Sequence, residues 1–481
     1  MGSYTISPTL NPSRVFILQK SELEKRFDPF YYVPELLELE KKVLAKKPKK
    51  LRDYVVSVSS GATPKTTESE LYYAEKENGI PFLRVQNLSP TGVLEFADCK
   101  YINHETHNGM LKRSQVSAGD LLVKITGVGR MAIASVAPEG FIGNINQHVC
   151  VIKTGSREIS ETLAAFLNSD IGEKLASRRS AGGTRPALDY PALLSIPIIE
   201  DKRILQITNK VIEQKQKNEA ESDKLLSSID DYLLKELGIK LPEPPENTLK
   251  NRMFIKTFKE ISDGRLDPHF HQEKFKQLDL QLSKGLYPLF KLKKKSILIT
   301  SGATPLSKGD SYTEDASIGI PFVRSGEIKD ITFEDCIYIK PEIHNSMLKS
   351  SQLKKGDLLI AIVGATIGEV GIYNHEREAN INQAIALVRL SDELLPIFAK
   401  DFYKSSIGSF ILDRAKRPVA RANINLDEIG ILPIPVPPLS KQKEIANHIT
   451  DIRNKAQQLK DKTKELLKKA SEEIEKILIG K

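Results

Sequence analysis

The sequence predicts an α+β protein in which two β-rich domains, related as an internal repeat, are separated and joined by two long antiparallel coiled-coil helices. Two observations support this fold class. A series of short segments in the first half of the 481-residue chain occurs again, in the same order, in the second half. Each copy is followed by a long helical pattern with a single apolar stripe. Such a stripe needs a partner, and the two helices can cover each other.

The repeat and the helices together divide the chain into six parts. These are an N-terminal arm and surface helix at 1–50, a first domain at 51–200, a central spacer helix at 201–240, a linker and surface helix at 241–290, a second domain at 291–438, and a C-terminal spacer helix at 439–481. The segment LPEPPEN at 241–247 is rich in proline, which favours a stiff and extended linker.

The repeat itself consists of short motifs. SGATP occurs at 60–64 and 301–305, and GIPF followed by an apolar residue and arginine begins at 79 and at 319. The motifs HNxMLK, GDLL and NINQ follow in both halves. An Arg-x-Asp-Pro turn precedes each copy, at Arg26 and at Arg265. The spacing between copies drifts by only a few residues, which indicates two versions of one folding unit with small loop insertions.

The helical segments show heptad-like spacing. In the first helix, residues seven apart form a seam, and in the second helix apolar residues alternate at intervals of four and three. Asn218 is the polar member, a residue type that fixes register in coiled coils. About 36 residues at ~1.5 Å each give a rod of roughly 54 Å. The predicted seam residues are Ile204, Val211, Asn218, Leu225, Tyr232, Ile445, Ile449, Ile452, Leu459 and Leu466.

Between these landmarks, each copy contains short runs of β-forming residues separated by Gly, Pro and Asn, which is typical of a twisted, mainly antiparallel sheet. In the first copy we expect strands near 54–58, 81–85, 121–125, 131–136 and 148–152. A helix at 163–175, a loop at 177–190 and a strand at 193–199 should follow. The second copy predicts a helix at 396–410, a loop at 413–423 and a strand at 431–436. Surface helices are expected within 22–50 and at 272–282.

Composition narrows the function classes. The formal net charge of +9 favours a polyanionic partner. Three cysteines cannot form a disulfide framework, and no apolar run is long enough to span a bilayer. From these features we expect a cytoplasmic protein without a membrane partner.

Catalytic motifs are missing from the sequence. It contains no GxxxxGK[ST] phosphate loop, and Gly127-Val128-Gly129 is too short a match to a dinucleotide-binding turn. Asp28-Pro29-Phe30-Tyr31 lacks the second proline of the aminomethyltransferase tetrapeptide. His107 and His344 recur without other metal-binding residues at ligand spacing, so we predict no metal site. We therefore expect a non-catalytic chain without a cofactor of its own.

Basic residues in loops that also carry Gly, Thr and amide side chains are the main candidate site. Arginine and lysine suit phosphates and guanine edges, and Asn and Gln suit adenine edges. Each single residue also has a plainer interpretation as a solvated charge, but the loops recur in both halves. The predicted DNA-binding residues are Thr63, Lys65, Arg84, Gln86, Asn87, Arg130, Arg178, Arg179, Arg185, Thr304, Lys308, Arg324, Arg414, Lys416, Arg417 and Arg421.

The layout of repeated SGATP, GIPF-x-R, GDLL and NINQ segments with two spacer helices resembles the specificity subunits of type I restriction–modification systems. The resemblance covers the chain from about Arg26 to the end. It implies that each domain reads one half of a bipartite target in double-stranded DNA. It also implies that the helices set the distance between the halves and dock two methyltransferase subunits, and that restriction subunits cleave the DNA.

The same resemblance places AdoMet, ATP and Mg²⁺ in the partner subunits. Two alternatives stay open at this point. One is a type IIB-like complex, in which a single partner both methylates and cleaves. The other is a non-DNA coiled-coil scaffold that carries two β-rich binding modules. Two different half-sites cannot be read by identical side chains, so base reading is expected where the two copies differ.

Overall fold

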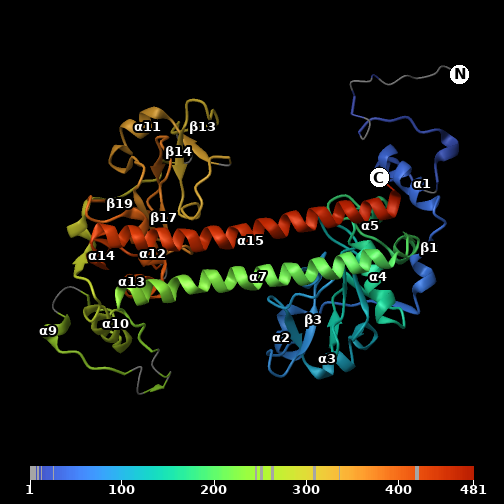
Figure 1. Ribbon diagram of the computed structural model, residues 1–481, viewed down its shortest axis with the longest axis horizontal. Helices are drawn as coiled ribbons and strands as arrows, with labels where there is room; N and C mark the ends of the chain where they lie inside the picture. The colour runs from blue at the N-terminus through green and yellow to red at the C-terminus, as the bar shows by residue number, and fades with distance from the viewer. Residues whose placement is uncertain are drawn as a thin grey trace. The chain divides into compact units, whose positions relative to one another are not determined.

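The computed structural model describes residues 7, 10–11, 14–24, 26–243, 246, 248–249, 253–261, 265–306, 310–334, 336–417 and 422–480. The chain divides into two compact units (Figure 1). Unit 1 comprises Met1–Glu219 with Lys460–Lys481, and unit 2 comprises Ala220–Leu459. Each unit therefore contains one copy of the repeat and one part of each long helix. Within the described residues, no helix is long and apolar enough to cross a membrane.

Unit 1 contains two four-stranded sheets and one short strand pair. The first sheet has the order β2-β9-β6-β7, the second has the order β4-β3-β8-β5, and β1 pairs with β10. The strands are β1 Lys49–Lys50, β2 Ser57–Ser60, β3 Ile80–Leu83, β4 Lys100–Ile102, β5 Gln115–Ser117, β6 Leu121–Lys124, β7 Ala134–Val136, β8 Ile142–Ile145, β9 Val149–Lys153 and β10 Pro197–Ile198. Strand pairing is antiparallel except between β3 and β8, which run parallel.

Six helices of unit 1 precede the long helices. They are α1 Pro34–Leu44, α2 Ser69–Tyr72, α3 His104–Asn108, α4 Arg157–Leu167, α5 Asp170–Arg179 and α6 Tyr190–Leu194. Apolar side chains of α4, α5, β6 and β9 form the main core of unit 1, which also includes Ile204, Ile474 and Leu478 from the two long helices. The long helices are therefore part of the domain core and not only a connection.

Unit 2 repeats the first sheet and the short strand pair, and its second sheet differs at both edges, where β13 is added and the counterpart of β5 is only a bridge between Gln352 and Asn380. Its sheets have the orders β12-β19-β16-β17 and β13-β15-β14-β18, and β11 pairs with β20. The strands are β11 Leu289–Lys291, β12 Ser296–Ser301, β13 Tyr312–Thr313, β14 Ile320–Val323, β15 Ile337–Ile339, β16 Leu358–Ala361, β17 Val370–Ile372, β18 Asn380–Ile381, β19 Ile385–Leu390 and β20 Pro433–Pro435. Here β14 and β18 form the parallel pair, as β3 and β8 do in unit 1.

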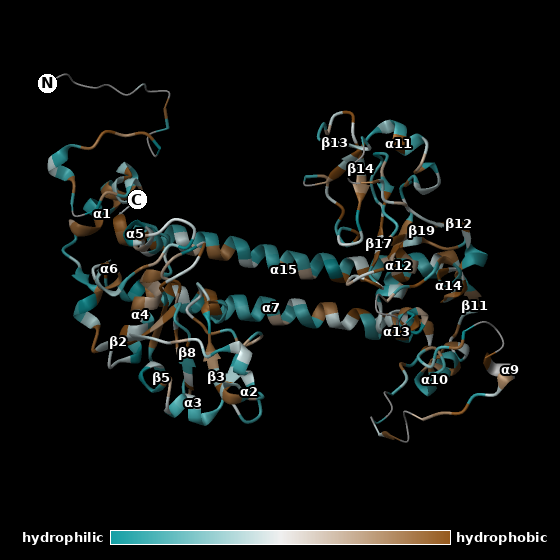
Figure 2. Cartoon of the chain, turned by 180° about the vertical axis from the view of Figure 1, so that it is seen from behind, coloured by the Kyte–Doolittle hydropathy of each residue, from teal (hydrophilic) through white to brown (hydrophobic). Residues whose placement is uncertain are grey.

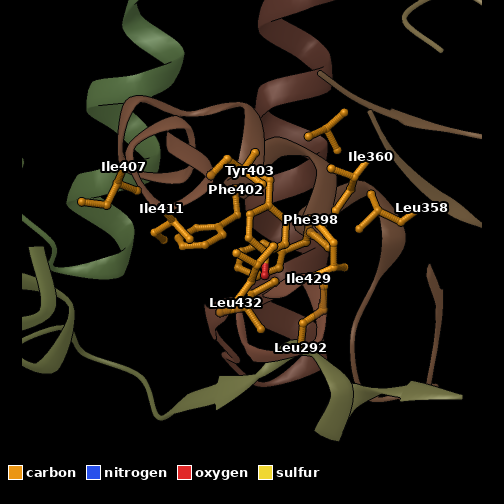
Figure 3. Close-up of a cluster of buried hydrophobic side chains, with 14 of the residues drawn as sticks. Leu292, Leu358, Ile360, Phe398, Phe402, Tyr403, Ile407, Ile411, Ile429 and Leu432 are labelled. Atoms are coloured by element: carbon orange, nitrogen blue, oxygen red, sulfur yellow. The ribbon is translucent and has the colours of Figure 1, made fainter. Parts of the chain in front are cut away.

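Four helices of unit 2, α10, α12, α13 and α14, contribute to a core that contains aromatic side chains. The shorter helices of this unit are α9 Phe258–Ile261, α10 Glu273–Ser283, α11 Pro341–Asn345, α12 Pro396–Lys404, α13 Ser406–Ala415 and α14 Leu426–Ile431. Figure 3 shows Phe398, Phe402 and Tyr403 at the centre of this core, with Ile429 and Leu432 beside them. Burial of Tyr403 raises the pKa of its hydroxyl far above the ordinary value.

The two long helices are α7 Lys202–Leu237 and α15 Leu439–Ile479. In unit 1, Asn218 Nδ2 donates to Thr463 Oγ1 at 3.0 Å, and both side chains are buried. In unit 2, Lys441 pairs with Glu236 at 2.6 Å, and Ser222 Oγ donates to Ala456 O at 3.4 Å. As residue numbers increase along α7, the residues of α15 that they contact have decreasing numbers. The helices therefore pack antiparallel within each unit, as predicted. Figure 2 shows hydrophilic residues along much of both helices.

The seam residues divide by burial. Ile204, Val211, Asn218, Ile445, Ile449 and Ile452 are buried, and Leu225, Tyr232, Leu459 and Leu466 are half-buried. Near the end of α15 the buried positions are Ile474 and Leu478, whereas Ile477 is half-buried. This shift arises because Ile474 and Leu478 pack into the unit 1 core. With both sheets, the repeat and the helices in place, the α+β class is confirmed.

Several predicted elements were wrong in detail. The helices expected at 163–175 and 396–410 are each split in two, because Ser169 and Ser405 accept hydrogen bonds from Gly172 N and Gly408 N and start new helices. The strand expected at 193–199 is only Pro197–Ile198, after the short helix α6. Residues 244, 245 and 247 of the predicted linker at 241–247 lie outside the described residues.

Candidate nucleic-acid interface

The predicted recognition loops of unit 1 leave the same end of the two sheets. Strand β2 ends at Ser60 opposite Cys150, and β6 ends at Lys124 opposite Val149. Strand β3 ends at Leu83 beside Ile145, the last residue of β8. The loops that contain Thr63, Arg84, Arg130 and Gln147 therefore emerge together. We call this region the loop end of unit 1.

The loop end of unit 2 is built in the same way. Ser301 of β12 pairs with Ala386, and Ala361 of β16 pairs with Ile385. Val323 of β14 pairs with Ile381 of β18. The loops containing Thr304, Arg324 and Gln383 consequently occupy positions equivalent to those in unit 1.

The glycine of SGATP allows its loop to cross the end of the neighbouring strand. A Cβ atom on Gly61 would lie 1.6 Å from Ile145 O, and one on Gly302 would lie 1.7 Å from Ile381 O. No side chain fits such an approach, so this motif keeps the loop against the NINQ segment. The repeat of SGATP thus has a structural explanation.

The NINQ motif divides between internal and exposed residues. Its first asparagine is buried and hydrogen-bonds to a histidine of the HNxMLK motif, Asn144 to His107 and Asn380 to His344. Its second asparagine closes a turn, because Asn146 Oδ1 accepts from His148 N at 3.1 Å. Gln147 and Gln383 are exposed and contact the exposed hydroxyls of Thr63 and Thr304. The two glutamines of this motif are exposed, whereas Asn382 is half-buried and Asn146 is buried.

A hairpin extends the loop end of unit 1. Ala181 N donates to Ala187 O at 2.8 Å, and Ala187 N donates to Ala181 O at 2.7 Å. The loop between them includes Gly182, Gly183, Thr184 and Arg185, which are all exposed. Gly127 N donates to Pro186 O at 3.1 Å, and Leu188 N donates to Ile125 O at 2.8 Å. These bonds hold the hairpin beside the loop that follows β6.

Unit 2 has the corresponding hairpin neck. Arg417 N donates to Asn423 O at 2.8 Å, and Ile424 N donates to Ile362 O at 2.9 Å. Arg417 is exposed and Lys416 is half-buried. Residues 418–421, and with them the predicted site residue Arg421, lie outside the described residues, as does Lys308.

Other predicted site residues are also presented at the loop ends. Thr63, Lys65, Gln86, Thr304 and Arg324 are exposed, and Arg84 is half-buried. The Arg84 guanidinium donates to Asp98 O at 2.8 Å, and Arg324 pairs with Glu327. Arg324 and Thr304 also line a cavity of about 990 Å³ together with Tyr338, Phe333 and Asn382.

Arg178 and Arg179 do not fit their predicted DNA-binding role. Both are buried at the end of α5 and form ion pairs with Glu40 of α1. Arg178 Nε donates to Tyr31 O at 2.8 Å, and Arg179 Nε donates to Ser195 Oγ at 3.0 Å. Burial is the largest influence on both guanidinium pKa values and lowers them. The two guanidinium groups are thus bound to partners inside the protein, so we no longer count Arg178 and Arg179 among the DNA-binding residues.

Asn87 is corrected for the same reason, whereas Arg130 and Arg414 are half-buried with internal partners and their DNA-binding role stays a prediction. Asn87 is buried, and its Nδ2 donates to Glu95 O at 2.9 Å. Arg130 donates to Asp170 and to Asn168 O, which tie it to the junction of α4 and α5. Arg414 forms two hydrogen bonds to Asp279 of α10 at 2.6 and 2.8 Å. These side chains stabilise the fold behind the loops.

Three residues at the loop end of unit 1 were missed by the sequence analysis. Lys124 is buried, and its Nζ donates to Val128 O at 2.7 Å and to Arg130 O at 2.9 Å, which shapes the loop after β6. Burial lowers its pKa. Val128 and Thr184 are exposed in that loop and in the hairpin. Their proximity depends on bonds between segments distant in sequence, although the glycines beside Val128 and Thr184 signalled turns.

No group of three or more His, Cys, Asp or Glu side chains that could hold a metal ion is found among the described residues. What the loop ends offer is a set of exposed cationic, hydroxyl and amide groups on rigid sheets. Such groups suit hydrogen bonds to phosphates and base edges.

Comparison with known proteins finds sequence similarity to one class of protein. Residues 299–469 match the type I restriction modification DNA specificity domain. The type I restriction enzyme EcoBI specificity subunit of Escherichia coli is 25% identical over 419 residues, which cover 83% of this chain and 78% of that protein. The putative type I restriction enzyme MjaX specificity subunit of Methanocaldococcus jannaschii is 27% identical over 222 residues, covering 44% of this chain and 50% of that protein.

A solved structure shares the fold. It comes from a study of complex assembly and conformational transition of the type I R-M system, with a TM-score of 0.51 and 16% sequence identity, and the match covers 90% of this chain and 97% of that one. The sequence matches and the shared fold agree with the repeated loop ends. Residues 299–469 thus match the DNA specificity domain of type I restriction–modification systems, and most of the chain is similar in sequence to type I specificity subunits.

Proposed function

We propose that this protein is the DNA sequence-specificity subunit of a restriction–modification complex, and that each unit reads one half of a bipartite target. The observation that carries the proposal is the duplicated loop end. Both units present loops on the same scaffold, but their exposed side chains differ. Lys65 of unit 1 corresponds in the repeat to Leu306 of unit 2, and Ala181 corresponds to Arg417. A shared scaffold with different surface groups suits two different half-sites.

The chemistry of the loop ends supports DNA as the ligand. Lys65, Arg185, Arg324 and Arg417 are exposed. Arginine forms bidentate hydrogen bonds with guanine, and lysine and arginine both neutralise phosphates. Thr184, Gln147 and Gln383 add groups that can donate and accept hydrogen bonds. The predicted domains at 51–200 and 291–438 are therefore our candidates for the two target readers.

In this proposal the chain directs chemistry that partner subunits perform. Two methyltransferase subunits would bring AdoMet, and restriction subunits would bring ATP and Mg²⁺. The complex would act in the cytoplasm. The type IIB-like alternative differs only in the partner, since one polypeptide would then both methylate and cleave.

Selection from a random duplex library tests the proposal. We expect the chain, assembled with its methyltransferase partner, to enrich duplexes with two short half-sites at a fixed separation. The affinity should fall as salt rises, because phosphate contacts release counterions. A scaffold that does not bind DNA would give neither enrichment nor a salt-dependent affinity, and that result would overturn the proposal.

A further inference from the structure

We propose that Arg26 and Arg265, the arginines of the two Arg-x-Asp-Pro turns, are positioning residues that set the orientation of the recognition hairpins. The inference rests on the proposed DNA-reading function and adds a specificity role for a motif outside the loop ends. Neither arginine contacts DNA in this proposal. Each acts through the hairpin of its own unit.

In unit 1, Arg26 forms hydrogen bonds with the end of helix α5. Its Nη1 donates to Arg179 O at 2.7 Å, and its Nη2 donates to Ser180 O at 2.8 Å. These are the last backbone carbonyls before Ala181, where the hairpin begins. A cation at this point is also favoured by the negative end of the helix dipole. The guanidinium thus joins the helix end and the hairpin base to the turn that precedes the domain.

Unit 2 has the same contacts. Arg265 Nη1 donates to Ala415 O at 2.9 Å, and Nη2 donates to Lys416 O at 2.8 Å. Here the hairpin neck begins at Arg417. Both arginines therefore bind the two carbonyls directly before a hairpin neck.

Each guanidinium is itself held on two sides. Asp28 accepts from Arg26 Nε and Nη2, both at 2.8 Å, and Asp267 accepts from Arg265 Nε at 2.7 Å. An aromatic ring lies against the cation, with Tyr31 4.6 Å from Arg26 and Phe270 4.7 Å from Arg265. Such contacts restrict where the guanidinium can point.

The backbone of each arginine is fixed by a different side chain. The Tyr32 hydroxyl donates to Arg26 O at 2.8 Å, and His271 Nε2 donates to Arg265 O at 2.6 Å. Two residue types thus maintain one geometry. The agreement of donor positions, despite this difference, indicates that the placement of the helix end is the shared feature of the turns.

In unit 1, the other bonds that hold the described hairpin are backbone bonds at the neck, at Pro186 and at Leu188. In unit 2, the Arg417 side chain also pairs with Glu428. Base contacts require groups held within a fraction of an ångström of the correct position. A hairpin free to tilt about its neck would keep its charge near the phosphates but lose its register on the base edges. We call Arg26 and Arg265, with their bonds to the two carbonyls, the arginine clamps of the two units. Each clamp should therefore affect discrimination between DNA sequences more than it affects non-specific affinity for DNA.

The test uses the full chain assembled with its methyltransferase partner and the duplex found by selection. Binding is measured to the complete target and to two targets in which one half-site is scrambled. We expect Arg26→Ala to lower discrimination at the half-site read by unit 1 by about tenfold. Discrimination at the other half-site and binding to random DNA should be unchanged, and Arg265→Ala should give the mirror result.

Hydrogen exchange supplies a second readout. In Arg26→Ala, amides of 181–188 should exchange faster while those of β6 and β9 keep their protection. Arg26→Lys keeps the charge but cannot reach both carbonyls and Asp28 as a fork, so it should give an intermediate result. Phe27→Ala and Leu266→Ala are matched controls, because these side chains are 82% and 74% exposed in the same turns.

The outcomes separate the two proposals. If the wild-type complex does not distinguish a scrambled half-site, the proposed function fails. If it does, but Arg26→Ala and Arg265→Ala discriminate as well as wild type, the positioning role is wrong and the function stands. Equal loss at both half-sites, or loss of protection across the whole unit, would also overturn the positioning role.

Discussion

The hairpin bases of the two units solve one structural problem with charges from different elements. In unit 1, Glu40 of α1 lies between Arg178 and Arg179, behind the hairpin. In unit 2, Glu428 of α14 accepts from Arg265 and from Arg417, the residue that begins the hairpin, at 2.9 and 2.8 Å. The arginine clamp is common to both units, whereas the buried carboxylate comes from α1 in unit 1 and from α14 in unit 2.

The difference follows from a few residues of the repeat. Asp189 and Asn425 cap α6 and α14 in the same way, accepting from Ala192 N and Glu428 N. Ala192 of unit 1 thus occupies the position that Glu428 occupies in unit 2. Arg417 is consequently linked to the interior, whereas Ala181 presents no charge. The scaffold tolerates different hairpin chemistry as long as each buried cation has a partner.

Removal of either buried carboxylate should give the largest effect and should stay within one unit. Glu40→Ala leaves two buried guanidiniums without their carboxylate partner. Glu428→Ala removes the shared partner of Arg265 and Arg417. Glu40→Ala should cost about 3–5 kcal/mol of unfolding free energy. Glu428→Ala should cost less, because Arg265 keeps its pair with Asp267 and Arg417 is exposed. Hydrogen exchange resolved by segment would assign the loss to unit 1 for Glu40→Ala and to unit 2 for Glu428→Ala.

Glu38→Ala is the matched control on α1, because its exposed pair with Lys42 should contribute less than about 1 kcal/mol. Losses of that small size for Glu40→Ala, or exchange in both units, would contradict the comparison.

Alanine at the SGATP glycines should have the next largest effect. Gly61→Ala and Gly302→Ala force a Cβ against the carbonyl oxygen of the neighbouring strand and should cost about 1–3 kcal/mol. Thermal unfolding and half-site binding would show whether each substitution disturbs only its own loop end. Gly183→Ala is the control, because nothing lies within 4 Å of its Cβ position. Equal stability of Gly61→Ala and Gly183→Ala would refute the close approach.

The long helices allow the two units to be tested as separate readers. One extra heptad after Glu219 and one after Leu459 lengthen each helix by about 10 Å, close to three base pairs. Seven residues nearly complete two turns, so the seam can re-form. Methylome sequencing should find both half-sites unchanged and the gap wider by two to four base pairs. An unchanged gap would show that the helices do not set the spacing.

The smallest expected effect is the pH dependence of the clamp. Burial raises the pKa of Asp28, but the hydrogen bond and the charge of Arg26 lower it by a larger amount, so the net shift of this pKa is downward. The same holds for Asp267 with Arg265. A lowered pKa means that the pair stabilises the fold above the usual aspartate range, near pH 3.9, and loses this contribution as pH falls through the lowered value.

Hydrogen exchange at the hairpin should therefore differ by a constant factor between wild type and Asp28→Asn from pH 8 to pH 5. The difference should shrink only at more acidic pH. A transition near neutral pH would show that another group controls the clamp.

The sequence predicted features that depend on local pattern or on duplication. Seven-residue spacing identified α7 and α15, and the repeated motifs identified the two units and their loops. It failed where long-range contacts decide the outcome. Arg178 and Arg179 resemble a basic loop in sequence, but Glu40, about 140 residues earlier, makes them internal. The break between α4 and α5 was missed because Ser169 acts as a helix cap only once the chain turns there.

The candidate site shows the same limit. SGATP and NINQ were recognisable as repeats, but their close approach at Gly61 depends on the parallel pairing of β3 and β8. Lys124 carries no motif, and its role follows from carbonyls of the loop that folds over it. Exposure, which separates Arg185 from Arg179, is a property of the folded unit.

The central claim, that each unit reads its own half of the target, is tested most directly by one methylome comparison. Cells would carry either the wild-type chain or Thr184→Ala combined with Arg185→Ala, together with the methyltransferase partner. We predict that the variant relaxes one or more base positions in a single half-site, while the gap and the other half-site stay the same. Relaxation in both half-sites, or an unchanged target, would contradict the account.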